Sequence, residues 1–283
     1  MTLPYTMPGR LAWQAEHRGS AVALREKRLG VWEEITWEGY RNRMADVARM
    51  LEELGVGPGD HVGILSDNRT EWLFCDLGSQ LLGARSAGIY QTNPPKDVAY
   101  VLNHANCKVL FCEDQEQVDK AIEVADQTPT VSAVVVFDPQ GLRHYTDSRL
   151  MPWDVFLEKG AALRDGDVDW LPARLEALQS DEPAMVVYTS GTTGQPKGAM
   201  LTGQNLLSAA DELVSIIGSG PDDLILSYLP LCHVAEKIFS LTIPLSSGAV
   251  VHFGESIYTI QQDLREVSPT IFLGVPRIWE KIH

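Results

Sequence analysis

The sequence predicts an α/β protein made of two αβ subdomains, with mostly parallel sheets flanked by helices. Short apolar runs that are typical of buried strands alternate with longer segments of helical periodicity. Each apolar run is also separated from the next by enough residues for a crossover helix, which parallel pairing requires. With 283 residues, of which 45% are hydrophobic, the chain is long enough for one large or two ordinary cores.

The alternation begins at residue 36. Residues 36–54 predict an amphipathic helix, with Thr36 as its N-cap and Gly55 just past its last turn. The elements expected after it are a strand over 61–65, a helix over 68–82, a strand over 84–89, a helix over 95–104, a strand over 108–112, a helix over 116–125 and a strand over 132–137.

The pattern weakens over residues 138–182, which are polar and rich in turn residues. We interpret this stretch as a connection with one or two short helices, so the predicted subdomains are 1–180 and 181–283. In the second one we expect a strand over 184–188, a helix over 205–217, a strand over 224–228, a helix over 234–245, a strand over 249–253, a helix over 257–267 and a strand over 270–273.

The charge of the chain argues against binding to nucleic acid. With 23 basic and 38 acidic residues, the formal net charge is -15, so a phosphate backbone would be repelled. A phosphorylated ligand would instead need a local device, such as backbone N–H groups, a helix N-terminus, a lysine or a metal ion.

Apolar patterning and cysteine spacing bear on the location of the protein. The first twenty residues lack the apolar centre of a signal peptide, and no apolar run is long enough to span a bilayer. We therefore expect a cytoplasmic protein, with peripheral membrane contact left open. The four cysteines show no CxxC spacing and are expected to be free and mostly buried thiols. They are Cys75, Cys107, Cys112 and Cys232.

The segment that carries most chemical information is YTSGTTGQPKG, residues 188–198, directly after the expected strand 184–188. Its glycines let the backbone turn N–H groups toward an anion, its Ser and Thr hydroxyls can donate hydrogen bonds or bind Mg²⁺, and Lys197 adds a positive charge. It is not a Walker A loop, because Lys197 follows a proline and precedes Gly198. Composition alone is equally typical of a flexible, solvated surface loop.

Residues 188–198 resemble, almost residue for residue, the signature of the AMP-forming adenylating superfamily, which includes acyl-CoA synthetases, luciferases and the adenylation domains of peptide synthetases. Residues 227–237 (SYLPLCHVAEK) and 275–281 (VPRIWEK) resemble two later segments and indicate the long-chain fatty acid–CoA ligase branch, although that branch often has arginine at the position of Lys237. Residues 60–72 and 87–102 are also similar, so the resemblance covers nearly the whole chain.

The resemblance implies roles for individual residues. The ATP-binding residues would be Thr189, Ser190, Gly191, Thr192, Thr193, Gly194 and Lys197. Thr192 would bind Mg²⁺, or alternatively donate to a phosphate oxygen. His233 is the catalytic candidate, as a contact to the substrate carboxylate or the adenylate or as a gate between them; the alternative is a histidine that only caps the following helix.

The implied activity is that of a long-chain fatty acid–CoA ligase, which converts ATP, a fatty acid and CoA to acyl-CoA, AMP and diphosphate in fatty acid metabolism. The fold would be the N-terminal part of the large domain of adenylating enzymes. Family motifs expected later in the sequence are not found before residue 283, so we expect a fragment that lacks the C-terminal domain and is inactive alone. Two alternatives stay open: a fatty acyl-AMP ligase that serves a carrier protein, and a non-catalytic nucleotide-binding module.

Several other residues are expected to be structural. Aromatic side chains in the apolar rhythm predict core packing, and charged pairs in the last two family-like segments predict salt bridges on helix surfaces. The aromatic residues are Trp72, Tyr100, Phe111 and Trp279, and the charged ones are Glu236, Lys237, Glu280 and Lys281. An apolar tunnel for an alkyl chain is expected near His233.

Overall fold

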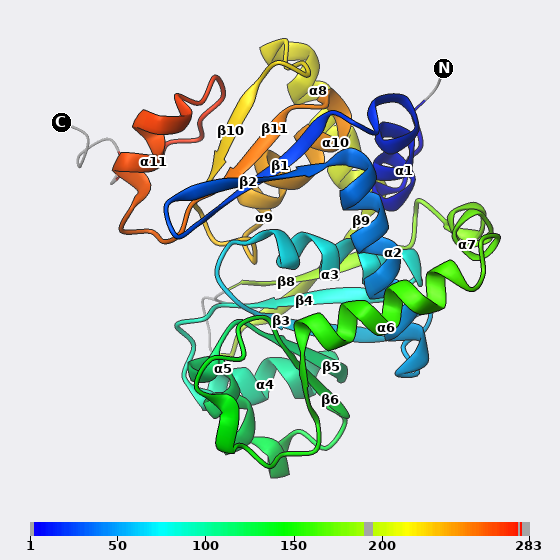
Figure 1. Ribbon diagram of the computed structural model, residues 1–283, viewed down its shortest axis with the longest axis vertical. Helices are drawn as coiled ribbons and strands as arrows, with labels where there is room; N and C mark the ends of the chain where they lie inside the picture. Colours follow the sequence, from blue (N-terminus) through cyan, green and yellow to red (C-terminus); the bar gives the residue numbers. More distant parts are fainter. Residues whose placement is uncertain (1–2, 190–194, 277, 279–283) are drawn as a thin grey trace.

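The strands of the computed structural model, which describes residues 3–189, 195–276 and 278, form two sheets (Figure 1). The larger has seven strands in the order β7-β6-β5-β3-β4-β8-β9. Its neighbours pair in parallel, except that β9 is antiparallel to β8. The strands are β3 (His61–Leu65), β4 (Arg85–Ile89), β5 (Cys107–Cys112), β6 (Ala133–Val136), β7 (Leu150–Pro152), β8 (Pro183–Thr189) and β9 (Lys197–Thr202).

The smaller sheet has four strands in the order β10-β11-β1-β2. Strands β10, β11 and β1 pair in parallel, and β2 is antiparallel to β1. Their bounds are β1 (Val22–Arg28), β2 (Val31–Thr36), β10 (Leu224–Ser227) and β11 (Val250–Phe253). The mixed, mostly parallel α/β architecture predicted from the sequence is confirmed.

Helices cover both faces of the larger sheet (Figure 1). A layer between the sheets contains α2 (Trp37–Glu53), α3 (Thr70–Leu81) and α6 (Trp153–Asp165), and the opposite face of the larger sheet is covered by α4 (Pro95–Ala105) and α5 (Gln115–Glu123). The remaining helices are α1 (Met7–Arg18), α7 (Trp170–Ala177), α8 (Gly203–Ile217), α9 (Val234–Lys237), α10 (Ile243–Ser247) and α11 (Ile260–Val267), with short helical turns at Ala125–Gln127, Leu142–His144 and Ile238–Thr242.

Strand alternation divides the core into two layers. In β5, Val109 and Phe111 join the cluster between the sheets, whereas Leu110 and Cys112 join the cluster under α4 and α5. Both faces of this strand are therefore apolar, as expected for a central parallel strand. Trp72 and Phe111 are fully buried, and all four cysteines are free and buried, which confirms the predictions made for these residues.

The expected elements of the first half are found within a few residues, and the strand predicted over 61–65 matches β3. Others were missed. Helix α1 and the hairpin of β1 and β2 precede the first expected element, and β9 follows the loop. The hairpin turns at Leu29 and Gly30, both with positive φ, as a two-residue turn between twisted strands requires. The strand predicted over 270–273 is reduced to an isolated β-bridge between Ile271 and Ile225.

The sheets do not follow the predicted division at residue 180. Strands β8 and β9 come after that residue but complete the larger sheet, while β1 and β2 come from the first part of the chain and complete the smaller one. The segment 138–182 also holds more structure than predicted, because α6 has 13 residues and β7 adds an edge strand. The two sheets are thus interleaved in sequence, a feature that local patterns do not reveal.

Candidate functional site

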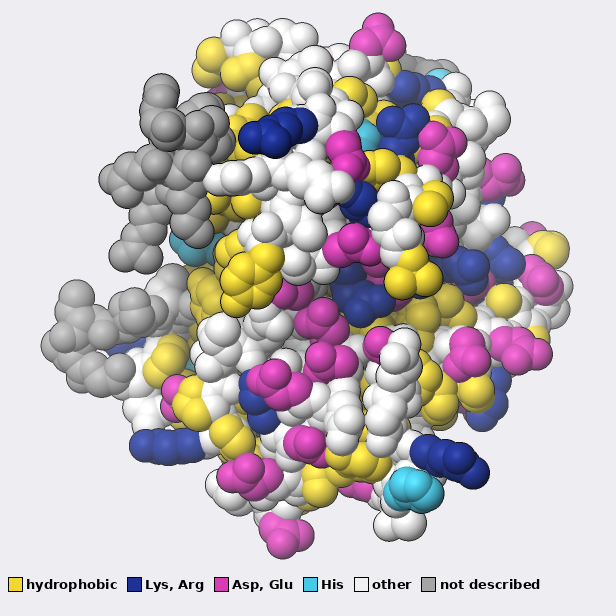
Figure 2. Space-filling view, turned by 60° about the vertical axis from the view of Figure 1, so that its left-hand side comes forward, with side chains coloured by type: hydrophobic (Ala, Val, Ile, Leu, Met, Phe, Trp, Pro, Cys, Tyr) yellow, Lys and Arg dark blue, Asp and Glu magenta, His cyan; other side chains and the backbone are white. Residues whose placement is uncertain are grey.

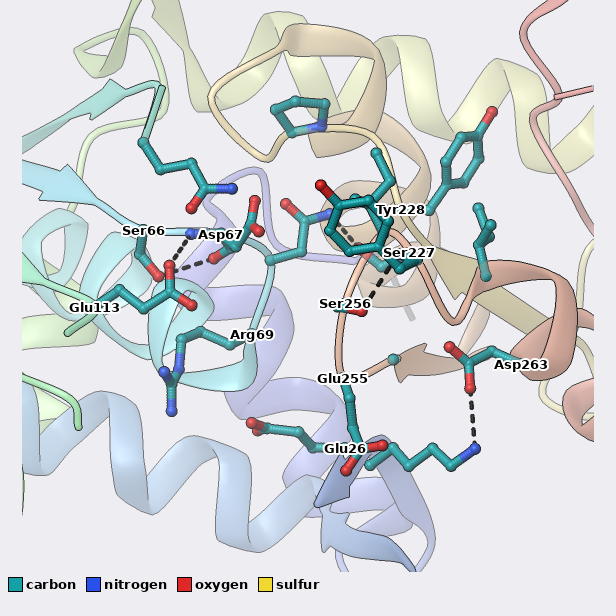
Figure 3. Close-up of a pocket in the computed structure, with 18 of the residues that line it drawn as sticks. Glu26, Ser66, Asp67, Arg69, Glu113, Ser227, Tyr228, Glu255, Ser256 and Asp263 are labelled. Carbon is teal, nitrogen blue, oxygen red and sulfur yellow. Dashed lines mark hydrogen bonds and ion pairs between the residues drawn. The ribbon is translucent and has the colours of Figure 1, made fainter. Parts of the chain in front are cut away.

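A cavity of about 730 Å³ lies at the carboxyl ends of the parallel strands, where residues of both sheets meet. Open α/β sheets bind ligands at this edge, because the loops that leave the strands diverge there. Figure 3 shows side chains from both sheets facing this space. The residues that line the cavity include Ser66 and Asp67 after β3, Tyr90 after β4, Glu113 after β5, Ser227 and Tyr228 at the end of β10, and Glu255 after β11.

The basic side chains at this cavity already have acidic partners. The Lys27 ammonium lies 3.1 Å from Asp263 and 2.7 Å from Glu266, and Arg28 and Arg69 lie 2.7 Å and 2.9 Å from Glu71. Their charges are therefore largely compensated within the protein. On the face that Figure 2 displays, acidic and basic side chains are likewise interspersed. The cavity wall is a poor binding surface for a polyphosphate, which leaves the loop after β8 as the phosphate-binding candidate.

One wall of the cavity carries two carboxyl groups, Glu113 and Asp67, whose pKa values are raised by burial. Glu113 accepts a hydrogen bond from the backbone N–H of Asp67 at 2.7 Å. Burial raises the pKa of Glu113 and also that of Asp67, because a charged carboxylate loses hydration there. The carboxyl oxygens of this wall can accept hydrogen bonds from hydroxyl or amide groups of a ligand.

The base of the predicted phosphate loop is held in place by pairing and by α4. Thr189 and Lys197 are opposite each other in the β8–β9 ladder, and both are exposed. The Tyr100 hydroxyl donates to the carbonyl of Pro196 at 2.8 Å, and the Tyr188 hydroxyl lies 2.9 Å from Nδ1 of His104. Tyr100 therefore anchors the loop, a role that the prediction of simple core packing missed.

The described strand β8, which precedes this loop, pairs with β4, and Tyr90 just after β4 lines the cavity. Five of the predicted ATP-binding residues, Ser190, Gly191, Thr192, Thr193 and Gly194, lie outside the described residues. Thr189 and Lys197 are thus the two predicted phosphate contacts whose positions are known. Within the part of the chain that the structure describes, no group of three or more His, Cys, Asp or Glu side chains is placed to hold a metal ion.

His233 lies in a turn that connects β10 to α9. Its backbone N–H donates to the carbonyl of Pro230 at 2.8 Å, and its Nδ1 accepts from the N–H of Ala235 at 3.1 Å. The side chain is exposed and forms the N-cap of α9. His233 therefore caps α9, and contact of His233 with a substrate stays a prediction. Its neighbours Pro230 and Cys232 line the cavity.

Two charged residues of α9 lie in the interior, so the prediction that they form salt bridges on a helix surface was wrong. Lys237 and Glu236 are each 2% exposed. The Lys237 ammonium lies 2.5 Å from Asp76 of α3. Glu236 accepts hydrogen bonds from the hydroxyls of Ser227 and Ser240 at 2.6 and 2.5 Å. Their partners are distant in sequence or on another element, which explains why helical spacing alone suggested surface positions.

Asn68 ties the same turn to the larger sheet. It follows β3, and its side-chain amide donates to Ser227 Oγ at 2.9 Å and to the Leu229 carbonyl at 2.5 Å. Its carbonyl oxygen accepts from the N–H of Leu231 at 2.8 Å. The turn before His233 is therefore held by side chains from both sheets.

Glu236 should make stability depend on pH. Burial raises its pKa to about 7 from an ordinary 4.5, so the folded state keeps a proton that the unfolded state loses first as the pH rises. Stability contributed by this proton is complete below pH 4.5 and is lost as the pH rises through about 7. The wild type should therefore lose on the order of 3 kcal/mol of unfolding free energy between pH 4.5 and about 7. Glu236→Gln lacks the titrating group and should not show this loss.

Urea unfolding of both proteins at a series of pH values measures this difference. Glu158→Gln, an exposed substitution on α6, is the control and should follow the wild type at every pH. If the wild-type and Glu236→Gln curves ran parallel through the window, the buried glutamate would not be titrating as described.

Within the described residues, no helix combines the length and the apolar character that crossing a membrane requires.

Comparison with known proteins gives a consistent result. A family model described as AMP-binding enzyme matches residues 11–283. The chain is 35% identical, over 99% of its length, to the rat long-chain-fatty-acid–CoA ligase ACSBG2, and 31% identical to the human protein of that name. It spans 42% of the length of each of these relatives.

Solved structures agree on the fold. A putative long-chain-fatty-acid CoA ligase from Rhodopseudomonas palustris CGA009 superimposes with a TM-score of 0.78 over 98% of this chain and 65% of its own, at 19% identity. The anthranilate CoA ligase AuaEII, solved in complex with anthranoyl-AMP, gives a TM-score of 0.80 over 99% of this chain and 51% of its own, at 22% identity.

Proposed function

Because the chain belongs to the family of AMP-binding enzymes, we propose that the whole protein is an AMP-forming long-chain fatty acid–CoA ligase. The observation that carries the proposal is the 35% identity over 99% of the chain to a relative of that name. The arrangement of the site supports it, since β8, which leads into the predicted phosphate loop, pairs with β4, and Tyr90 just after β4 lines the cavity.

In the proposed reaction, the fatty acid carboxylate first attacks the α-phosphorus of ATP. This forms acyl-AMP and releases diphosphate, and it replaces an oxide leaving group by the much better leaving group AMP. The thiol of CoA then attacks the acyl carbon, loses its proton and displaces AMP, which yields the thioester. Little covalent chemistry is asked of the protein, so positioning and charge stabilisation do most of the work.

The described residues can take defined parts in this scheme. Lys197, exposed at the base of the loop, would place its ammonium against phosphate oxygens, and Thr189 would contribute a hydroxyl. His233, at the exposed N-terminus of α9, would contact the carboxylate or the adenylate. Ser190, Gly191, Thr192, Thr193 and Gly194 would complete the phosphate contacts.

Mg²⁺ also belongs to this proposal, with Thr192 as its ligand; it would neutralise charge on the phosphates. The roles assigned to Lys197 and His233 do not depend on it. A cytoplasmic location, with contact to the membrane surface, is likewise proposed, because fatty acids partition into lipid.

The proposal predicts a strong preference for long acyl chains. An alkyl chain gains about 0.8 kcal/mol per buried methylene, or roughly fourfold in kcat/KM. A full-length version of the protein should therefore use palmitate with a far higher kcat/KM than acetate, measured as acid-dependent ATP–diphosphate exchange. The second half-reaction is measured by comparing CoA with an acyl carrier protein as acceptor, and we expect CoA to be used. A preference for acetate would refute the long-chain assignment, and transfer to carrier protein alone would refute the ligase assignment.

A further inference from the structure

A buried ion pair lies beside the proposed active site but belongs neither to the loop nor to the cavity lining. The Lys237 ammonium is 2.5 Å from Asp76 Oδ2 and 3.9 Å from the centre of the Trp72 ring. The side chains of Lys237 and Asp76 are 2% and 0% exposed. Removing two charges from water costs about as much as their attraction returns, so such a pair is weak evidence for added stability. Its geometric effect is more informative.

The Asp76 end of the pair is fixed to the larger sheet. Its Oδ1 accepts from the Ser86 hydroxyl at 2.6 Å and from the Gln80 amide at 3.0 Å. Ser86 belongs to β4 and is in register with Met185 of β8, the strand that leads into the phosphate loop. The carboxylate therefore has a defined position relative to that strand.

The Lys237 end is fixed to the turn that carries His233. Lys237 is the last residue of α9, and its N–H donates to the His233 carbonyl at 3.2 Å. The turn also touches β4 directly, since a Cβ placed on Gly88 would be 2.8 Å from the Cβ of Cys232. The contact between Cys232 and Gly88 fixes the distance of the turn from β4. The ion pair between Lys237 and Asp76 then restricts rotation of α9 relative to β4.

We propose that Lys237 and Asp76 are positioning residues, which hold the His233 turn at a fixed place relative to the end of β8. This inference rests on the proposed function, because it concerns alignment of the fatty acid at the His233 turn with ATP at the β8 loop. Reactions between bound partners are sensitive to such alignment, and a misplacement of about 1 Å can cost about 10²-fold in rate. ATP binding itself should depend little on the pair, since Lys197 and Thr189 are held by β8, β9 and α4.

The test uses a full-length version of the protein and removes both charges together. The double variant Lys237→Met/Asp76→Asn leaves no unpaired buried charge, so it should fold, and circular dichroism checks this. Palmitate-dependent ATP–diphosphate exchange then gives kcat and the KM for ATP. Lys237→Arg keeps the positive charge and is the conservative variant. Arg10→Met is the matched control, since Arg10 is also 1% exposed and pairs with Asp211 on α8, away from the turn.

We expect the double variant to lose about 10²-fold in kcat with a KM for ATP within about twofold of the wild type. Lys237→Arg should recover most of the kcat, and Arg10→Met should lose stability but keep its kcat. A folded double variant with wild-type kcat, or an equal loss of kcat in Arg10→Met, would overturn the positioning role while leaving the proposed function intact. Absence of exchange in the wild type would instead overturn the proposed function, and the positioning role with it.

Discussion

Replacing Lys197 by alanine is expected to lower palmitate-dependent ATP–diphosphate exchange by about 10²- to 10³-fold, the usual cost of losing one preorganised group that stabilises charge in a transition state. The basic residues at the cavity are compensated by Asp263, Glu266 and Glu71. Lys197 is exposed at the base of the loop, so its ammonium can reach a phosphate there. The measurement is the exchange rate of a full-length version at saturating ATP and palmitate.

Lys159→Ala is the control, because Lys159 is exposed on α6, in the layer between the sheets, and should have no effect on exchange. A Lys197→Ala rate within about threefold of the wild type would contradict the charge-stabilising role, which is worth roughly a hundredfold or more.

Replacing Gly160 by alanine is expected to destabilise the fold by about 3 kcal/mol or more, which is at the high end for overpacking. A Cβ at this position in α6 would lie 2.0 Å from the backbone carbonyl oxygen of Asp46 in α2. Neither backbone can yield easily, because α2 and α6 pack along each other in the layer between the sheets. This loss should outweigh the gain of about 1 kcal/mol that alanine normally brings to a helix.

Gly166→Ala, at the C-terminal end of the same helix, is the matched control. Its φ is −74° and a Cβ there would be no closer than 3.4 Å to a neighbour. Urea unfolding should therefore show a change within about 1 kcal/mol for this variant. Equal stability of Gly160→Ala and Gly166→Ala would mean that the two helices are not packed as closely as described.

Local sequence patterns predicted the elements that are determined by neighbouring residues in the chain. The strand over 61–65 is an apolar run bounded by turn residues, and Thr36 caps α2 as expected, accepting from the N–H of Gly39 at 3.1 Å. The spacing of Trp153, Phe156, Leu157 and Gly160, all buried, is also helical. One or two short helices were expected in residues 138–182, where α6 and α7 are found, but the bounds and length of α6 were not predicted because the surrounding segment is polar.

Other features depend on partners that are distant in sequence. Glu26 and Lys27 of β1 are charged residues of a kind usually found in solvent, but both are buried. Thr70 donates a hydrogen bond to Glu26, and Asp263 forms an ion pair with Lys27. Lys237 was misjudged for the same reason, since its partner Asp76 is 161 residues away. Charged residues with such partners are placed by tertiary structure, and no periodicity reveals them.

Residue types and the family resemblance led to a predicted site whose roles stay predictions, whereas the contacts around it were not predicted. Thr189 is the last residue of β8, where the predicted phosphate loop begins, and Lys197 is the first residue of β9. The anchoring contacts of Tyr100 with Pro196 and of Asn68 with the turn before His233 were not foreseen. Each joins a polar side chain to a backbone group on another element, and many Tyr and Asn residues could form such a bond.

The central claim is that the protein activates a fatty acid by way of an acyl adenylate. Palmitate whose carboxylate carries the heavy isotope of oxygen tests it directly, in a reaction of the full-length protein with ATP and CoA. If the carboxylate attacks the α-phosphorus and AMP is then displaced by the thiol, mass spectrometry should find one heavy oxygen in each AMP and none in diphosphate. Heavy oxygen in inorganic phosphate together with ADP, or palmitoyl-CoA formed with unlabelled AMP, would contradict this account.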